Sequence, residues 1–170
     1  MEIDVSKVKE VREKTGAGIM AAKKALEESS GDVSKAEEIL KQQGLSNALK
    51  KSGRETSEGV IGSYIHAGNK IGAMVELKCE TDFVARTEEF INLSKDLAMQ
   101  VAAMSPSYIY PDDEGAKDST PDEILVSQSF IKDPSITIED MIKSMISKVG
   151  ENIKVSKIIK FDLSLSLIHI

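Results

Sequence analysis

The chain has 170 residues, 41% of them hydrophobic and 29% charged, which is typical of a globular protein of one or two small domains. Its formal net charge of -6 argues against a general nucleic-acid binder, because phosphate binding depends on lysine and arginine. The single cysteine, Cys79, excludes an intrachain disulfide and favours a reducing compartment, and no apolar run approaches the roughly 20 residues of a membrane span.

The N-terminal part of the chain has the hydrophobic spacing of three short helices. Valines recur at helical intervals before the turn signal TGAG at residues 15–18. A second helix is expected over about residues 19–29 and a third over about 33–43. The inward stripe of the second helix is expected to comprise Ile19, Ala22 and Leu26. Because such short helices are unstable alone, we expect a packed helical domain over residues 1–46.

A polar and charged stretch over residues 47–58 indicates a linker. Beyond it the hydrophobic period changes from helical to two. A first strand is expected from Gly59, a turn at residues 67–70, and a strictly alternating strand over residues 71–79. This pattern predicts an antiparallel hairpin.

The remainder of the chain predicts helices and one closing strand. A helix is expected after Thr87, a loop over residues 105–120, a short helix from the capping-box sequence TPDE at Thr120, and a further helix after Thr137. The closing strand is expected to place on one face Ile153, Val155, Ile159, Phe161 and Leu163. The order of elements predicts an α+β core domain over residues 59–163, with a small antiparallel sheet packed with helices. We assign no function to the tail over residues 164–170.

No set of side chains forms a recognisable catalytic or metal site. The two histidines, His66 and His169, have no zinc-ligand spacing with Cys79. The TGAG sequence lacks the preceding strand that a phosphate-binding glycine loop requires. We therefore expect no enzyme activity, cofactor or metal. The alternative hypothesis is a small enzyme whose active site is built around Cys79 and His66.

Two features of the sequence suggest contacts with a partner protein. Met20 falls beside Lys23 and Lys24, on the side of its helix that should meet water, although it could equally tuck into the rim of a helical core. Asp82 and Phe83 follow the last position of the alternating strand. They are either a local cap and a core plug, or a wedge at the rigid end of the hairpin that enters an apolar pocket of a partner. The pattern alone leaves both interpretations open.

Three long segments resemble one known family, in the right order and over well over half the chain. They are VREKTGAGIMAAKKALEESSGDVSKAEEIL (11–40), EGVIGSYIHAGNKIGAMVELKCETDFVARTEEF (58–90) and KVGENIKVSKIIKFDL (148–163). The chain is identified by these segments as similar to translation elongation factor Ts. The resemblance implies a ubiquitin-associated-like three-helix bundle followed by the α+β core, and a guanine-nucleotide exchange factor for elongation factor Tu.

The resemblance also implies which residues bind. The residues that would contact the GTPase domain of Tu and dislodge its Mg²⁺ are Thr81, Asp82, Phe83 and Val84. Those that would contact a Tu helix near the nucleotide are Arg12, Ile19 and Met20, which moves Ile19 from the inward stripe to the binding face. The alternative is a ubiquitin-associated-like adaptor without exchange activity.

The resemblance has two further implications. A family member would act in the bacterial cytoplasm or in an organellar matrix or stroma, without direct contact to nucleic acid or membrane. The region over residues 105–134 is shorter than in many members, which leaves part of the sheet exposed and suggests a homodimer through the core sheet.

Overall fold

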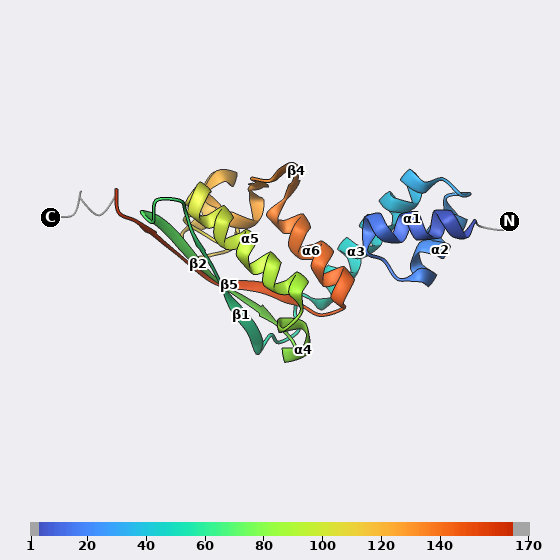
Figure 1. Ribbon diagram of the computed structural model, residues 1–170, viewed down its shortest axis with the longest axis horizontal. Coiled ribbons are helices and arrows are strands. Elements are labelled where there is room, and N and C mark those ends of the chain that lie inside the picture. The colour runs from blue at the N-terminus through green and yellow to red at the C-terminus, as the bar shows by residue number, and fades with distance from the viewer. Residues whose placement is uncertain (1–3, 165–170) are drawn as a thin grey trace. The chain divides into compact units, whose positions relative to one another are not determined.

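The computed structural model describes residues 4–164 (Figure 1). Contacts divide the chain into two units. The first comprises the chain up to Gly53 together with Lys143–Gly150, and the second comprises Arg54–Ile142 and the chain from Glu151 onward. The boundary after Gly53 falls inside the stretch in which the sequence indicates a linker.

The first unit contains the helices α1 (Val5–Thr15), α2 (Ile19–Glu28) and α3 (Val33–Lys51). The carboxylates of Asp4 and Asp32 cap α1 and α3 by accepting hydrogen bonds from backbone N–H groups of the first turn. The buried core of these helices consists of Val11, Ala22, Ala25, Leu26, Ala36 and Leu40. Three alanines in this set allow the helices to approach closely.

Helix α3 is longer than the sequence predicts. It passes through Gly44 and ends at Lys51, so the first residues of the expected linker are helical. A glycine inside a helix costs only about 1 kcal/mol relative to alanine. Ala48 is buried beyond Gly44, at 3% exposure, and its packing favours continuation of the helix.

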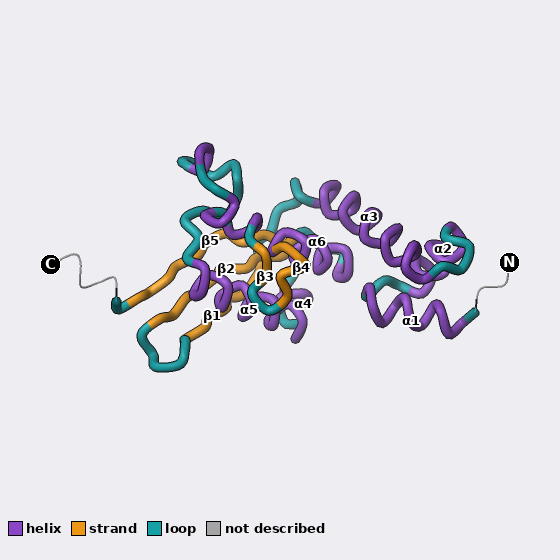
Figure 2. Tube along the Cα trace, turned by 90° about the horizontal axis from the view of Figure 1, so that it is seen from above, coloured by secondary structure: helices purple, strands orange, loops and turns teal. Residues whose placement is uncertain are grey.

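The second unit is built on a three-stranded antiparallel sheet in the order β1-β2-β5 (Figure 2). Its strands are β1 (Glu58–Ile65), β2 (Ile71–Cys79) and β5 (Ile153–Asp162). The central strand β2 therefore pairs with the first and the last strand of the chain. The α+β fold class and the predicted hairpin are confirmed.

Helix α5 (Glu88–Met104) packs against the inner face of this sheet. Thr87 caps the helix by accepting a hydrogen bond from the N–H of Phe90. Where α5 crosses β1, a Cβ on Gly62 would overlap the backbone carbonyl oxygen of Ser94. The close approach of helix and strand therefore requires glycine at this position.

A β-bulge in β5 reverses the expected orientation of its C-terminal half. The register shifts between Glu76 and Leu77 of β2, so that Ser156 is an extra residue on β5. The Ser156 hydroxyl donates to Glu76 Oε1 at 2.6 Å, which lowers the pKa of that carboxyl. Because one inserted residue exchanges the two faces of a strand, Ile159 and Phe161 point outward, and the prediction that they share a face with Val155 is wrong.

The outer face of the sheet consequently carries exposed apolar side chains. They are Ile61, Ile65, Met74, Ile159 and Phe161. Exposed apolar surface of this kind is typical of an interaction site.

The region between α5 and β5 contains a short hairpin that the sequence analysis did not anticipate. It is formed by β3 (Ser129–Phe130) and β4 (Asp133–Thr137), and α6 (Ile138–Val149) follows it. The side chain of Gln100 on α5 holds this region: its amide N–H donates to Gln128 Oε1 at 3.0 Å, and its oxygen accepts from the N–H of Ile131 at 3.0 Å. Strands of two and five residues are too short for a clear alternation pattern.

The capping-box sequence TPDE forms the predicted cap but not the predicted helix. The hydroxyl and N–H of Thr120 both donate to Glu123, yet only a single 3₁₀ turn follows (Pro121–Glu123). A second 3₁₀ turn (Leu125–Ser127) carries buried side chains instead of continuing an α-helix.

Candidate partner-binding site

The segment after β2 forms a four-residue helix, α4 (Asp82–Ala85), at the end of β2 remote from the hairpin turn. Helices of this length do not persist without tertiary contacts. Val84 and Ala85 supply such contacts, since they are 9% and 5% exposed. Phe83 points away from the interior and is 82% exposed, so the interpretation as a core plug is wrong.

Asp82, the residue before Phe83, remains accessible. Its carboxylate pairs with the guanidinium of Arg86 at 2.9 Å, and its side chain is 45% exposed. Asp82 occupies the first helical turn, where the positive end of the helix favours a carboxylate. The cap position itself belongs to Thr81, so Asp82 is not the local cap that the sequence allowed.

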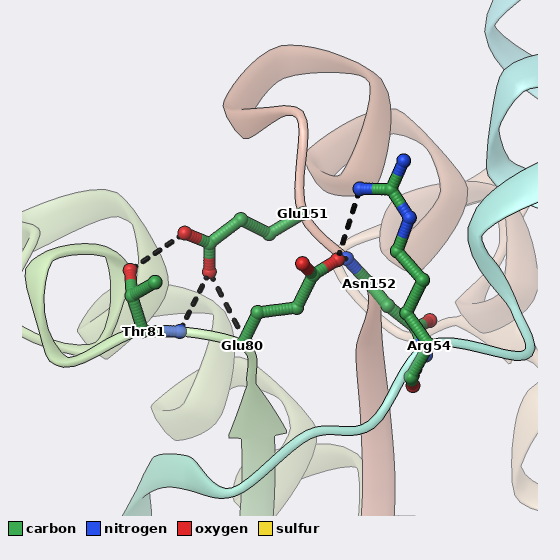
Figure 3. Close-up of polar contacts among 5 residues, drawn as sticks. All are labelled: Arg54, Glu80, Thr81, Glu151 and Asn152. Carbon is green, nitrogen blue, oxygen red and sulfur yellow. Dashed lines mark hydrogen bonds and ion pairs between the residues drawn. The ribbon is translucent and has the colours of Figure 1, made fainter.

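The residues just before α4 are held by a carboxylate from the turn between α6 and β5 (Figure 3). Glu151 Oε2 accepts hydrogen bonds from the backbone N–H groups of Glu80 and Thr81, at 3.1 and 3.0 Å. Its other oxygen, Oε1, accepts the hydroxyl of Thr81 at 2.6 Å. One side chain therefore satisfies three donors at the start of α4.

A second carboxylate returns the contact. Glu80 Oε1 accepts from the backbone N–H of Asn152 at 2.6 Å and lies 3.5 Å from the guanidinium of Arg54. The buried amide of Asn152 donates to the backbone oxygen of Arg54 at 2.7 Å. We call the five residues of Figure 3, Arg54, Glu80, Thr81, Glu151 and Asn152, the carboxylate clamp.

The carboxylate clamp was missed in the sequence analysis. Its two carboxylates are separated by about 70 residues in sequence. Both lie in segments that resemble the family, but neither the spacing nor the resemblance assigned a role to Glu80 or Glu151. The only local signal is that each carboxylate lies close to the end of a regular element: Glu80 directly follows β2, and Glu151 lies between α6 and β5.

The N-terminal candidate residues lie on the first unit. Arg12 is exposed on α1, and Met20 is 76% exposed on α2, so Met20 does not tuck into the rim of the core. Ile19 is 58% exposed, and its placement in the inward stripe is wrong. Ala25 takes the expected place of Ile19 in the core of α2, while Ala22 and Leu26 are buried as expected.

Val84 differs from the other residues that the resemblance implies. Its side chain is on the buried side of α4, whereas Thr81 and Asp82 are partly exposed. Its position suits an anchor for the helix rather than a surface for direct contact.

Cys79 and His66 are not brought together. Cys79 pairs with Glu58 at one end of the hairpin, whereas His66 follows the pair Ile65–Gly72 at the other. Seven residues at about 3.3 Å each separate the two ends. Burial raises the pKa of the Cys79 thiol to about 11, so the thiol is protonated at neutral pH. This geometry excludes a site that uses both residues.

Residues 4–164 contain neither a cluster of metal ligands nor a membrane-spanning helix. No three His, Cys, Asp or Glu side chains in this range are grouped as metal ligands. Within the same residues, no helix has both the length and the apolar character needed to cross a membrane.

Comparison with known proteins gives a consistent result. Residues 5–120 match the protein-family model described as Elongation factor TS. Elongation factor Ts of Thermosipho melanesiensis is 46% identical over 191 residues, covering 94% of this chain and 97% of the relative. The proteins of the same name from Carboxydothermus hydrogenoformans and Methylacidiphilum infernorum are 43% and 45% identical, covering 92% and 95% of this chain and 87% and 95% of the relatives.

These matches run over 191, 188 and 191 residues, more than the 170 residues of this chain, so the relatives carry insertions relative to it. The similarity nevertheless covers nearly the whole length of each partner in the comparison. It confirms the resemblance that the three sequence segments indicate. The chain therefore belongs to the elongation factor Ts family of translation elongation factors.

Proposed function

We propose that this protein is a guanine-nucleotide exchange factor for elongation factor Tu and that it is not itself an enzyme. The observation that carries the proposal is the exposure of Phe83, at 82%, on a short helix that is anchored on both sides, in a chain of the elongation factor Ts family. An aromatic side chain that is exposed on an anchored helix is suited to enter a pocket of a partner.

The proposed mechanism combines apolar burial with charge. Burying a phenylalanine side chain contributes about 1.5–3 kcal/mol, and a helix backbone that is already anchored loses little entropy on binding. Phe83 would enter the GTPase domain of Tu, and the adjacent carboxylate of Asp82 would disturb the groups that hold Mg²⁺. Val84 would support the helix from below, and Thr81 would fix its start.

Release of GDP follows from linkage. Mg²⁺ neutralises phosphate charge and couples a nucleotide to the protein loops around it. If binding of the exchange factor is incompatible with the intact Mg²⁺ site, the exchange factor lowers the affinity of Tu for GDP. GDP then lowers the affinity of Tu for the exchange factor in the same ratio. No covalent bond is made or broken in this exchange.

The N-terminal residues Arg12, Ile19 and Met20 would supply additional contacts to Tu. A methionine adapts to irregular apolar partners, and an exposed isoleucine beside it enlarges the contact. We expect the protein to act where translation takes place, in a bacterial cytoplasm or an organellar matrix or stroma.

The test is release of a fluorescent GDP from purified elongation factor Tu, followed by stopped flow with increasing concentrations of the factor. The wild type should accelerate release, and Asp82→Ala and Phe83→Ala should both slow it. Glu114→Ala is a matched control, because it removes one exposed carboxylate from a loop of the same unit. If the wild type leaves the rate of GDP release unchanged, the protein is a binding adaptor and the proposal is rejected.

We also propose that a second copy of the chain covers the exposed outer face of the sheet. The face presents Ile61, Ile65 and Phe161 to solvent, and a two-fold symmetric dimer would pair this patch with itself. Sedimentation equilibrium tests the proposal. A dimer should become a monomer in Phe161→Glu, and a monomeric wild type would contradict it.

A further inference from the structure

We infer that Glu151 is a positioning residue for exchange: its carboxylate fixes the start of α4, so that Asp82 and Phe83 are presented to a partner in one orientation. The inference rests on the proposed exchange function. It assigns to Glu151 a role that requires no contact with the partner.

The first step concerns the end of the sheet. Cys79 and Ile153 are the last paired residues of β2 and β5. Beyond this pair, the N–H groups of Glu80 and Thr81 have no strand opposite them. Glu151 accepts both, and a carboxylate has enough lone pairs to take the Thr81 hydroxyl as well. The side chain thus continues the pairing of β2 where the backbone ladder stops.

The second step concerns the cap of α4. Thr81 is the N-cap residue, where a threonine usually accepts a hydrogen bond from an N–H of the first helical turn. Here its side chain makes no such bond, and its hydroxyl donates to Glu151 instead. The beginning of the helix is therefore attached to a distant turn rather than capped locally.

The third step concerns the rigidity of the turn that carries Glu151. Gly150 ends α6 in the left-handed conformation, with φ of 78°, and directs the chain toward β5. The backbone N–H of Asn152 donates to the carboxylate of Glu80, and its side-chain amide donates to the backbone oxygen of Arg54. Glu151 is thus held on its C-terminal side by the same strand end that it holds.

Together these contacts define the direction in which Phe83 points. Val84 and Ala85 bury one side of α4, and Glu151 fixes its first residue. Without Glu151, α4 would keep its buried side, the Asp82–Arg86 ion pair and the contact of Cys79 with the Thr81 oxygen, but the N–H and hydroxyl of Thr81 would lose their acceptor. Preorganisation of this kind affects the step in which the ring must enter its pocket.

The kinetic experiment measures GDP release from elongation factor Tu against factor concentration for the full chain. Glu151→Ala should lower the maximal rate about tenfold, corresponding to about 1.4 kcal/mol, with the half-saturating concentration changed less than about twofold. Glu151→Gln keeps one carbonyl acceptor, so its maximal rate should fall only about threefold. The control Glu114→Ala should match the wild type.

The split between the two kinetic parameters separates positioning from folding. A variant that is partly unfolded has a lower active concentration, which raises the half-saturating concentration and leaves the maximal rate unchanged. A double-mutant cycle adds a second criterion. Glu151→Ala already removes the acceptor of the Thr81 hydroxyl, so adding Thr81→Val should make the double variant little slower than Glu151→Ala alone.

A further measurement does not depend on exchange at all. Deuterium uptake of a peptide covering residues 80–87 should be faster in Glu151→Ala than in the wild type, while peptides from α5 stay unchanged. Unchanged uptake in residues 80–87, or a maximal rate equal to that of Glu114→Ala, would overturn the inference. A wild type without exchange activity would reject the proposed function, and the uptake of this peptide would still decide the role of Glu151.

Discussion

The two candidate contact regions are constructed differently. Ile19 and Met20 lie on α2, a ten-residue helix whose neighbours in the chain already specify where each side chain points. Asp82 and Phe83 lie on α4, which has four residues and depends on contacts from distant parts of the chain. An exposed side chain on a regular helix needs only the helix, whereas one on a single turn needs an external anchor.

This difference separates two tasks that a binding surface performs. A helix face can supply affinity through exposed apolar side chains such as Met20, even if their rotamers adjust on contact. A wedge that must displace a bound ion has to arrive in a defined orientation, and the carboxylate clamp provides this at Phe83. We therefore expect the first region to affect affinity and the second to affect the rate of the exchange step.

The largest expected effect is on the scaffold of the second region. Gly62→Ala would force α5 away from β1, because the added Cβ overlaps the carbonyl oxygen of Ser94. We expect a loss of about 3 kcal/mol in the free energy of unfolding. Urea unfolding followed by tyrosine fluorescence reports on this unit alone, since the chain has no tryptophan and its three tyrosines are Tyr64, Tyr108 and Tyr110.

The control for this variant is Ser63→Ala, because Ser63 is the exposed neighbour of Gly62 on β1 and lies in the same unit. Its free energy of unfolding should stay within about 0.5 kcal/mol of the wild type. A Gly62→Ala protein as stable as this control would show that α5 can move away from the sheet without loss of stability. The close contact of α5 with β1 would then not be required by the fold.

The next effect is on the wedge itself. Phe83→Ala should lower the maximal rate of GDP release about 30-fold, the equivalent of about 2 kcal/mol for an interface hot spot. The urea midpoint should not change, because the ring is 82% exposed and contributes little to the core. A Phe83→Ala variant that keeps the wild-type maximal rate would remove the wedge from the mechanism.

A smaller effect of a different kind is expected on the helical region. Met20→Ala should raise the half-saturating concentration about fivefold, or about 1 kcal/mol, and leave the maximal rate unchanged. Lys35→Ala is the control, because its exposed side chain lies on α3 of the same unit and is placed in neither contact region. A Met20 variant that changes only the maximal rate would break the distinction between the two regions.

The smallest effect is the reactivity of Cys79, which lies beneath the start of α4. Its Sγ donates to the carbonyl oxygen of Thr81 at 3.2 Å, and burial raises the pKa of the thiol to about 11. At pH 8 only about a thousandth of the thiol is ionised, so alkylation of the native protein should be slow. The rate should rise about tenfold per pH unit up to about pH 11, and fast alkylation at pH 8 would show that the anchored region opens.

The same shift in pKa has a consequence for stability. The pKa of Cys79 is higher in the folded protein than its usual value of 9.0, so the folded state holds the proton more tightly. The stability that this provides is complete below about pH 9 and is lost as the pH rises through about 11.

Local patterns in the sequence were sufficient for most regular elements. The alternation of Ile71–Cys79 predicted β2, because a strand half-covered by α5 must bury every second side chain. Thr137 and Gly150 bounded α6 as expected, since both act within a few residues of the helix ends. The resemblance of TDFV and its neighbours to a known family then supplied the functional interpretation that the pattern alone left open.

Features that depend on contacts across the chain could not be predicted in this way. The bulge at Ser156 is visible only against β2, and it reversed the faces assigned to Ile159 and Phe161. The link from Glu151 to Thr81 joins residues that no local rule connects. Ile19 shows the same limit on a smaller scale, because the spacing of a helix does not say which of two adjacent apolar stripes its neighbours will cover.

The span of chain between Thr81 and Glu151 has a consequence for synthesis. A ribosome adds Thr81 70 residues before Glu151, and it adds β5, the second partner of the central strand, later still. The growing chain therefore displays an aromatic side chain before the group that orients it exists. Nascent and prematurely terminated chains therefore expose Phe83 without the Glu151 contact that orients α4. The segment reaches its final structure only when β5 has left the ribosome.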